Sequence, residues 1–226
     1  MQENTMQQKL REKMLSLGVT DVGFCQVEEG LDGLNNAMSI VIRLSDAILD
    51  EIVDAPTHTY FNHYRTVNFF IDQCLLQAGL LLQRNGYKFI TVAASQSIND
   101  EGWNYRGRYS HKAIARLSGF GSIGNSCLFL HKEYGPRVRL GTIFTDCEFE
   151  NPKELAKNPC INCNICKEMC PSGAISGKQW HPGMEREEFF DRAKCSNYMK
   201  RAYKHIGRGA VCGLCIKYCP MNKPHK

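Results

Sequence analysis

The sequence predicts a mixed α/β or α+β domain over residues 1–151, followed by a small cysteine-rich domain over residues 152–226. Two observations support this division. Short runs rich in β-branched residues alternate with helical patterns through the first 150 residues. Eight of the twelve cysteines then lie between residues 160 and 219. Pro152, Pro159 and the lysines between them mark the passage from one domain to the other.

The expected elements of the first domain are helices and short strands in alternation. The clearest helix carries apolar residues at helical spacing from Val67 to Leu82 and stops at Asn85-Gly86. We interpret this stripe as core packing. The other expected helices cover residues 5–17 and 110–117, and strands are expected over residues 22–27, 38–44, 87–94 and 138–146.

Composition indicates a soluble globular chain. Hydrophobic residues make up 43% of it and charged residues 23%, near the globular average, which excludes disordered and fibrous classes. The N-terminal residues mix charged and apolar side chains, so we expect no cleaved signal peptide. No run approaches the roughly 18 apolar residues that a membrane helix needs. The sequence therefore predicts a cytoplasmic protein without a membrane segment.

The first cysteine motif is Cys-x2-Cys-x2-Cys-x3-Cys-Pro, from Cys160 to Pro171. Bacterial ferredoxins use this run to hold 4Fe–4S clusters. A second motif ends in the same way, at Cys219-Pro220, but its first ligand is displaced upstream to Cys195. The two motifs predict two 4Fe–4S clusters that carry electrons one at a time.

In such motifs the fourth cysteine ligates the other cluster, which predicts two ligand sets. The first cysteine set, for cluster 1, is Cys160, Cys163, Cys166 and Cys219; the second cysteine set, for cluster 2, is Cys170, Cys195, Cys212 and Cys215. Four-thiolate zinc sites are the alternative, but zinc does not account for the third cysteine at x2 spacing or for the Cys-Pro endings. The scattered thiols, Cys25, Cys74, Cys127 and Cys147, are expected to be buried small side chains.

Charge is unevenly distributed between the two parts. Residues 151–226 carry a net charge of +8 and residues 1–150 a net charge of −3. A basic segment can indicate nucleic-acid binding, but these cations are scattered rather than aligned. Two anionic thiolate-bound clusters give another reason for the positive charge. We therefore do not expect nucleic acid or membrane as a partner.

The segment from His111 to Asp146 resembles the corrinoid-dependent epoxyqueuosine reductases and, more distantly, the reductive dehalogenases. It shows a helix, a Gly-x-Gly-x-x-Gly turn at 119–124, a Tyr134-Gly135 turn, and a strand that begins Leu-Gly and ends Thr-Asp. The two cysteine motifs follow in the family's order, with a Cys-Ser-x-Tyr element at 195–198. Because the glycine turn does not follow a strand, it is not interpreted as a dinucleotide-binding turn.

The resemblance implies a nitroreductase-like corrinoid-binding domain followed by a bacterial ferredoxin-like two-cluster domain. Electrons from a donor such as ferredoxin or flavodoxin would pass through the clusters to cobalamin, which would act on a small substrate. Missing Cβ atoms would let the backbone approach the flat corrin ring. The implied corrinoid-binding residues are Gly119, Gly121, Ser122, Gly124 and Asn125. A plain helix-to-strand turn is the alternative for these glycines.

This chain departs from the family pattern at two places. The family's catalytic aspartate, a proton donor, aligns with Tyr105, so Tyr105 is the predicted acid, with Arg106 and Arg108 to stabilise its phenolate. An exposed aromatic and basic loop is the alternative. The extension of the tRNA-acting members after the second motif is not found here, which makes epoxyqueuosine-tRNA a doubtful substrate. Four histidines are candidate axial ligands or structural residues: His58, His63, His111 and His131.

Three hypotheses of function follow. The leading one is a cobalamin-dependent iron–sulfur reductase with a small substrate. The second is a ferredoxin-type electron-transfer protein that reduces a corrinoid protein or another partner without substrate chemistry of its own. The third is a cobalamin-handling protein.

Overall fold

The computed structural model describes residues 5–96, 98, 105–209 and 211–221. The chain forms two compact units, each assembled from three segments. Unit 1 comprises Met1–Ile42, Val67–Phe120 and Arg139–Ala156, and unit 2 comprises Arg43–Thr66, Gly121–Val138 and Lys157–Lys226. The domain boundary between residues 151 and 152 stays a prediction. The compact units are discontinuous, and unit 2 joins two earlier segments to the cysteine-rich one.

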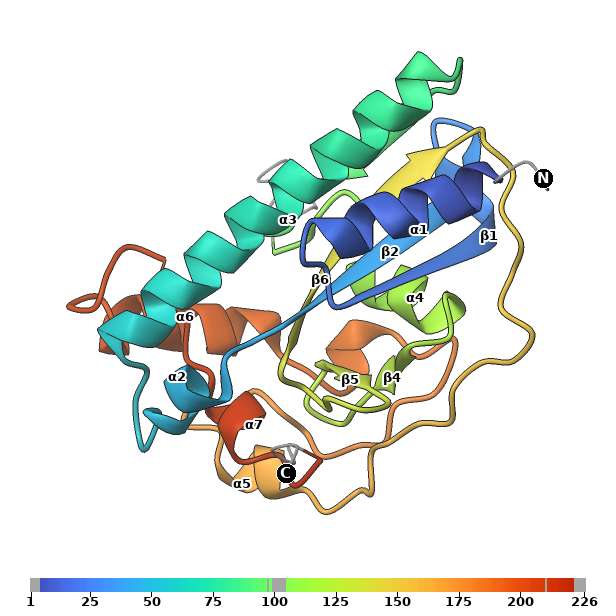
Figure 1. The fold of residues 1–226 in the computed structure, drawn as a ribbon. Helices are drawn as coiled ribbons and strands as arrows, with labels where there is room; N and C mark the ends of the chain where they lie inside the picture. Colours follow the sequence, from blue (N-terminus) through green and yellow to red (C-terminus); the bar gives the residue numbers. More distant parts are fainter. Residues whose placement is uncertain (1–4, 97, 99–104, 210, 222–226) are drawn as a thin grey trace. The chain divides into compact units, whose positions relative to one another are not determined.

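Unit 1 is built on a four-stranded sheet with the order β1-β2-β6-β3 (Figure 1). The strands are β1 (Asp21–Leu31), β2 (Leu34–Arg43), β3 (Phe89–Val92) and β6 (Val138–Thr145). β1 pairs antiparallel with β2, and β3 pairs antiparallel with β6. Antiparallel pairing identifies the mixed architecture as α+β in this unit.

One face of this sheet packs against α4 (His111–Leu117). Side chains alternate along β1, and Gly23 and Cys25 point to this face. A Cβ atom on Gly23 would lie 2.8 Å from the Cβ of Ser118, and the sulfur of Cys25 lies 4.0 Å from the carbonyl oxygen of Ile114. Glycine at position 23 therefore permits the close approach of the chain that follows α4.

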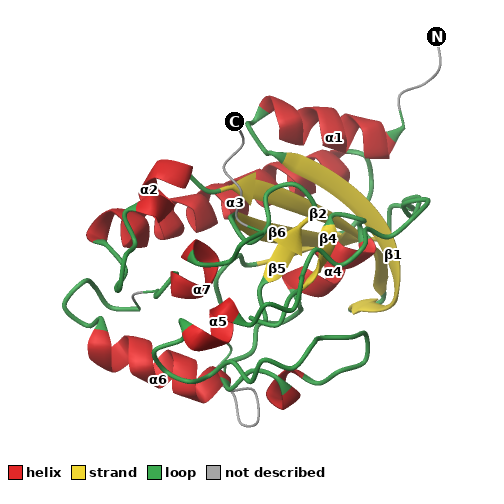
Figure 2. Cartoon of the chain, turned by 90° about the horizontal axis from the view of Figure 1, so that it is seen from below, coloured by secondary structure: helices red, strands yellow, loops and turns green. Residues whose placement is uncertain are grey.

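The opposite face carries α1 (Met6–Ser16) and the part of α3 (His58–Arg84) that belongs to unit 1 (Figure 2). Phe24 alternates with Gly23 and Cys25 in β1 and therefore points to this opposite face, where Arg11 of α1 lies 5.4 Å from its ring centroid. A Cβ atom on Gly141 would lie 2.5 Å from the Cγ2 of Ile71. Unit 1 is thus a sheet between helices, as the alternation of elements predicts.

The predicted helices and strands of the first 150 residues are confirmed, with differences at their ends. The first two strands are longer than predicted and meet at a turn where Asp32 and Gly33 have positive φ angles of 51° and 78°. The long helix begins at His58, well before its apolar stripe, because the hydroxyl of Thr57 accepts a hydrogen bond from the backbone N–H of Tyr60 at 3.0 Å.

Unit 2 contains one small sheet and several short helices. The small sheet is the hairpin of β4 (Gly121–Ile123) and β5 (Phe129–His131), and β4 begins inside the glycine turn at 119–124. The helices are α2 (Asp46–Asp50), the 3₁₀ helix Arg186–Glu188, α5 (Ile165–Glu168), α6 (Arg192–Ala202) and α7 (Leu214–Lys217), with the first turns of α3.

The core of unit 2 mixes residues from its early and late segments. Phe61 packs with Tyr203 and Ile206, and Ile123 packs with Cys127 and Phe189. The cysteine-rich segment is poor in large apolar residues, so residues 43–66 and 121–138 supply the surfaces that it buries.

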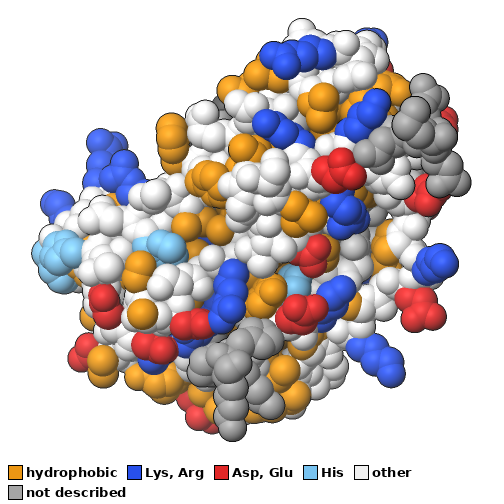
Figure 3. All heavy atoms as spheres, viewed as in Figure 1, with side chains coloured by type: hydrophobic (Ala, Val, Ile, Leu, Met, Phe, Trp, Pro, Cys, Tyr) orange, Lys and Arg blue, Asp and Glu red, His pale blue; other side chains and the backbone are white. Residues whose placement is uncertain are grey.

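Within the described part of the chain, the helices are too short or too polar to cross a bilayer. On the face drawn in Figure 3, the Lys and Arg side chains are interspersed with Asp and Glu side chains.

Candidate iron–sulfur centre

Each cysteine motif closes around a short helix that begins after a residue in the left-handed conformation. Asn164, with φ 61°, precedes α5, and Gly213, with φ 80°, precedes α7. This conformation favours Gly and Asn. The stretches 163–171 and 212–220 therefore repeat one local structure, and α5 contacts α7. In the second repeat Gly209 stands where Cys160 stands in the first, which explains why Cys195 of α6 is needed.

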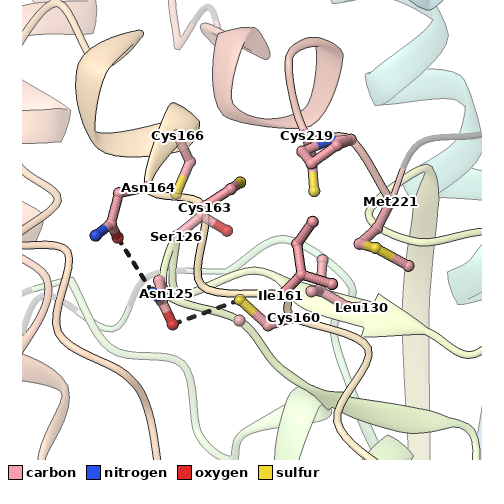
Figure 4. Close-up of a pocket in the computed structure, with 12 residues that line it drawn as sticks. Asn125, Ser126, Leu130, Cys160, Ile161, Cys163, Asn164, Cys166, Cys219 and Met221 are labelled. Carbon is pink, nitrogen blue, oxygen red and sulfur yellow. Dashed lines mark hydrogen bonds between the residues drawn. The ribbon is translucent and has the colours of Figure 1, made fainter.

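The first cysteine set lines one pocket (Figure 4). Three of its thiols come from the loop and helix at 160–166, and Cys219 comes from the end of the second motif. Their sulfur atoms lie around a shared space, and the pocket encloses about 340 Å³ of empty volume, part of it open to solvent. The sequence places Cys219 more than fifty residues away, and the fold brings it to the predicted partners.

The second cysteine set is also gathered in unit 2. Cys170, Cys212 and Cys195 are close enough for the charge of one thiolate to raise the pKa of another. The pKa of Cys215 is raised well above its usual range by burial and then by Cys212, Cys195 and Cys170. The eight thiols thus fall into the two predicted groups of four. Their assignment as ligands stays a prediction.

Burial opposes the thiolate form in most of this centre. It raises the pKa of Cys219 and of Cys195, each to about 11, and also raises that of Cys212. Because iron binds thiolates, cluster insertion must displace these protons.

Cys170 differs from its neighbours. Burial alone would raise its pKa, but the hydroxyl of Ser172 and backbone groups of Ser172, Ala174 and Ile175 outweigh it and lower the pKa. The turn after Cys170 is therefore arranged to stabilise a negatively charged sulfur.

Asn125 lies beside the first cysteine set and is 2% exposed. Its Oδ1 accepts a hydrogen bond from the thiol of Cys160 at 3.4 Å, and its amide group donates to Asn164 Oδ1 at 3.2 Å and to the carbonyl oxygen of Gly177 at 3.4 Å (Figure 4). The β4–β5 turn thereby contacts the loop that presents Cys160.

Charged and polar contacts hold α7, which contains Cys215 and ends two residues before Cys219. Lys217 donates to Asp50 Oδ1 at 2.9 Å, and Arg137 donates to the same carboxylate at 2.8 Å and to Asp46 at 2.9 Å. These two cations, Arg137 first, lower the pKa of Asp50. The hydroxyl of Tyr218 donates to the carbonyl oxygen of Val53 at 2.6 Å. α2 and the loop after it thus position the helix that carries the second motif.

The structure gives the predicted corrinoid-binding glycines packing roles. A Cβ atom on Gly121 would lie 1.9 Å from the carbonyl oxygen of Leu130, so glycine is needed for the β4–β5 hairpin. A Cβ atom on Gly124 would lie 2.8 Å from the Cδ1 of Leu130, and Gly119 ends α4 of unit 1 with φ 80°. Ser122 is buried in β4. Gly124 and Asn125 also line the pocket of the first cysteine set, and corrinoid binding by the predicted residues stays a prediction.

Tyr105, the predicted acid, adopts a left-handed conformation with φ 62° in unit 1. Trp103 beside it lies outside the described residues. Arg108 forms an ion pair with Asp32 at 2.8 Å, and Tyr109 donates its hydroxyl proton to the carbonyl oxygen of Glu29 at 3.1 Å. Arg108 is therefore engaged by the β1–β2 turn. The catalytic role of Tyr105 stays a prediction.

His111, His63 and His131 make local hydrogen bonds. His111 donates from Nε2 to the carbonyl oxygen of Ala93 at 3.1 Å and accepts at Nδ1 from Thr142 at 2.9 Å, so both ring nitrogens are used. Burial lowers its pKa to about 4. His63 accepts from the backbone N–H of Ser45 at 3.1 Å, and His131 accepts from that of Glu133 at 3.1 Å. His58 is exposed at the start of α3.

The four scattered thiols are buried, as predicted: Cys25, Cys74, Cys127 and Cys147. Cys127 belongs to unit 2 and lies near Cys195. Among the described residues, no three His, Cys, Asp or Glu side chains are arranged to bind a single metal ion. That finding concerns single-ion sites such as zinc.

The contacts around the sulfurs were not evident from the sequence. Asn125 was assigned to the corrin, and no motif singled out Ser172, Tyr203 or Arg137. Tyr203 caps α6 and its hydroxyl lies 3.9 Å from the sulfur of Cys212. The sequence did offer one signal for Ser172: a hydroxyl two residues after a cluster cysteine is close enough in the chain to contact its sulfur.

The grouped thiols and the repeated motif define an iron–sulfur protein with two 4Fe–4S clusters. Residues 159–222 match the model of the 4Fe–4S double cluster binding domain. The chain is 30% identical over 121 residues to the epoxyqueuosine reductase of Listeria monocytogenes, covering 53% of this chain and 31% of that protein. It is 26% identical over 125 residues to the tetrachloroethene reductive dehalogenase of Desulfitobacterium hafniense, covering 49% and 22%.

Solved structures of the same two groups share the fold. The catabolic reductive dehalogenase NpRdhA bound to 3-bromo-4-hydroxybenzoic acid superposes with a TM-score of 0.76 at 18% identity, over 96% of this chain and 32% of that one. A reductive dehalogenase described with B12-dependent dehalogenation gives 0.74 at 16%, over 96% and 32%. An epoxyqueuosine reductase bound to a tRNA stem loop gives 0.60 at 19%, over 95% and 64%.

These findings confirm the resemblance to epoxyqueuosine reductases and reductive dehalogenases. The matched part of this chain amounts to about a third or less of the curated relatives' own length, 31% and 22%. The mixed α/β fold with a double-cluster domain is confirmed, and the nitroreductase-like description stays a prediction.

Proposed function

We propose that this protein is an iron–sulfur oxidoreductase that relays single electrons through two 4Fe–4S clusters to a reducible acceptor. The observation that carries the proposal is the division of eight thiols into two groups of four, with Cys219 beside Cys160, Cys163 and Cys166. Cysteine thiolates in sets of four are the ligands of such clusters. The relatives with which the chain aligns are reductases, which supports the direction of electron flow.

The acceptor that we propose is cobalamin, serving reduction of a small substrate. Similarity to a reductive dehalogenase described with B12-dependent chemistry supports this step. When bound, cobalamin supplies a low-potential metal centre for reductive cleavage. The glycines expected to contact the ring are accounted for by protein packing, so no residue of this chain is assigned to hold it. We propose a small redox protein, such as a ferredoxin or flavodoxin, as the electron donor.

Anaerobic reconstitution followed by cobalamin titration tests both parts. The reconstituted chain should contain about eight irons and eight sulfides, as the two ligand sets require. Zinc in place of iron, or about four irons, would refute the relay. Cob(II)alamin added at micromolar concentration should then give a base-off electron paramagnetic resonance spectrum. A chain with eight irons and no such spectrum would retain the relay and exclude cobalamin as its resident acceptor.

The exposure of the first cysteine set favours a second candidate function, electron transfer to a separate partner. Cys163 is exposed, unlike the other cluster cysteines, and Ile161 beside it is 62% exposed. An exposed ligand shortens the path for an electron to leave the protein. Rapid reduction of an added corrinoid protein by a chain that binds no cobalamin would support this function.

A further inference from the structure

Hydroxyl groups lie next to two sulfurs of the second cysteine set. The Oγ of Ser172 is 3.3 Å from the sulfur of Cys170, and the hydroxyl oxygen of Tyr203 is 3.9 Å from the sulfur of Cys212. All four residues belong to unit 2. Neither hydroxyl belongs to a cysteine motif, and the electron relay does not require them.

The core of unit 2 holds the phenol of Tyr203 in place. Its side chain is 4% exposed and packs with Phe61 and Ile206. Its ring meets the ring of Tyr198 edge to face, with 5.7 Å between centroids. Tyr198 is the tyrosine of the Cys-Ser-x-Tyr element on α6. The fold therefore aims a phenol at Cys212 and supports it with a second one.

The direction of these hydrogen bonds follows from the state of the sulfur. As a thiol, Cys212 donates to the hydroxyl oxygen of Tyr203. A sulfur bound to iron is a thiolate and can only accept, so a hydroxyl can donate to it after rotating about its own C–O bond. At the first cysteine set Asn125 presents its amide oxygen to Cys160, and the whole amide would have to turn to donate. The second cysteine set therefore has two side-chain hydroxyls in place as donors.

We propose that Ser172 and Tyr203 donate hydrogen bonds to the cysteine sulfurs of cluster 2 and raise its reduction potential. The inference rests on the proposed function, because it takes the second cysteine set as the ligands. Reduction adds negative charge to the cluster and its sulfurs, so a donor stabilises the reduced form more than the oxidised form. The two residues thus tune the energy of the electron on this cluster without ligating iron.

The test compares Tyr203→Phe and Ser172→Ala with the wild-type protein, each reconstituted as the full chain. Each variant removes one donor and keeps most of the packing. The midpoint potentials of both clusters are measured by redox titration with electron paramagnetic resonance, together with iron and sulfide. One of the two reduction waves should move to a more negative potential. A hydrogen bond of this kind should change the reduction equilibrium by up to about tenfold, or about 59 mV for one electron.

Tyr109→Phe is the matched control. It removes a phenol hydroxyl from unit 1, where that hydroxyl donates to the carbonyl oxygen of Glu29 and not to a sulfur. It should leave both potentials unchanged. The proposal is supported if the same wave moves in Tyr203→Phe and Ser172→Ala but not in the control.

Two outcomes would overturn the proposal: unchanged potentials in both test variants at full iron content, or an equal shift in the control. If Tyr203→Phe does not retain iron, Ser172→Ala decides, because Ser172 lies in a partly exposed turn outside the core. A wild-type chain with fewer than about eight irons would instead refute the proposed two-cluster relay.

Discussion

Replacing Cys219 by Ala should damage cluster 1, although the motif that contains Cys219 supplies cluster 2. The structure places its thiol in the pocket of Cys160, Cys163 and Cys166. Burial raises the pKa of Cys219 most, and the charges of these same three thiols raise it further. This evidence that Cys219 lies near them does not depend on the sequence motif. Cys219→Ala leaves this pocket with three thiols and leaves the second cysteine set complete.

The size of the effect follows from the ligand count. A cluster with three protein thiolates has one iron without its cysteine, and it either loses that iron or is lost entirely. Iron should therefore fall from about eight per chain to between about seven and four, while cluster 2 stays intact. The same arithmetic applies to Cys195→Ala with the roles of the clusters exchanged.

The assay is anaerobic reconstitution, followed by iron and sulfide analysis and by electron paramagnetic resonance of the reduced protein. Cys163→Ala marks the signal lost with cluster 1, and Cys195→Ala marks the signal lost with cluster 2. Cys74→Ala, a buried thiol of unit 1, controls for general effects of cysteine removal. A spectrum of Cys219→Ala that matches Cys195→Ala rather than Cys163→Ala would refute the crossover.

Three further predictions concern the protein around the clusters. His111 should titrate near pH 4 by heteronuclear NMR. Because this folded pKa lies below the unfolded value of about 6.5, the neutral form of His111 stabilises the folded protein above pH 6.5, and this stability is lost as the pH falls toward 4. The contribution amounts to up to about 3 kcal/mol. A titration near 6.5 would contradict its burial. Gly121→Ala should lower the apparent melting temperature much more than Gly124→Ala. The new Cβ at position 121 would meet a backbone oxygen at 1.9 Å, whereas the one at position 124 would meet a side-chain methyl at 2.8 Å. Equal falls in melting temperature would contradict this reasoning. Arg137→Met should destabilise the protein by roughly 1–3 kcal/mol in thermal unfolding, and Lys217→Met by less than about 1 kcal/mol. The Arg137 side chain is 5% exposed and pairs with both Asp46 and Asp50, whereas the Lys217 side chain is 22% exposed and pairs with Asp50. The reverse order would count against that network.

The local parts of the fold were predictable because their signals are local. The helix over residues 5–17 has a polar cap at Thr5 and a positive-φ glycine at Gly18, and both are visible as letters. The spacing of the cysteines likewise encodes the two short helices, with Asn164 and Gly213 at the positions that need a left-handed backbone. These features depend on residues a few positions apart.

The composition of unit 2 could not be predicted in this way. Nothing in the letters of residues 43–66 indicates that Phe61 packs with Tyr203, or that Asp50 pairs with Lys217, because these contacts join residues more than a hundred positions apart. The glycines at 121 and 124 also have a packing role that the sequence pattern did not indicate. A Cβ atom on Gly121 would meet the carbonyl oxygen of Leu130, and one on Gly124 would meet a side-chain methyl of Leu130, while their contact with a corrinoid stays a prediction.

The discontinuity of unit 2 has a consequence for how the protein is made. During synthesis all segments of unit 1 are available once residue 156 has emerged, whereas residues 43–66 and 121–138 must wait for the cysteine-rich segment. Until then Phe61 has no Tyr203 to cover it. A nascent chain that exposes such surface is prone to aggregate. A fragment beginning at residue 152 should therefore express poorly even when iron and sulfide are plentiful, because it lacks residues 43–66 and 121–138.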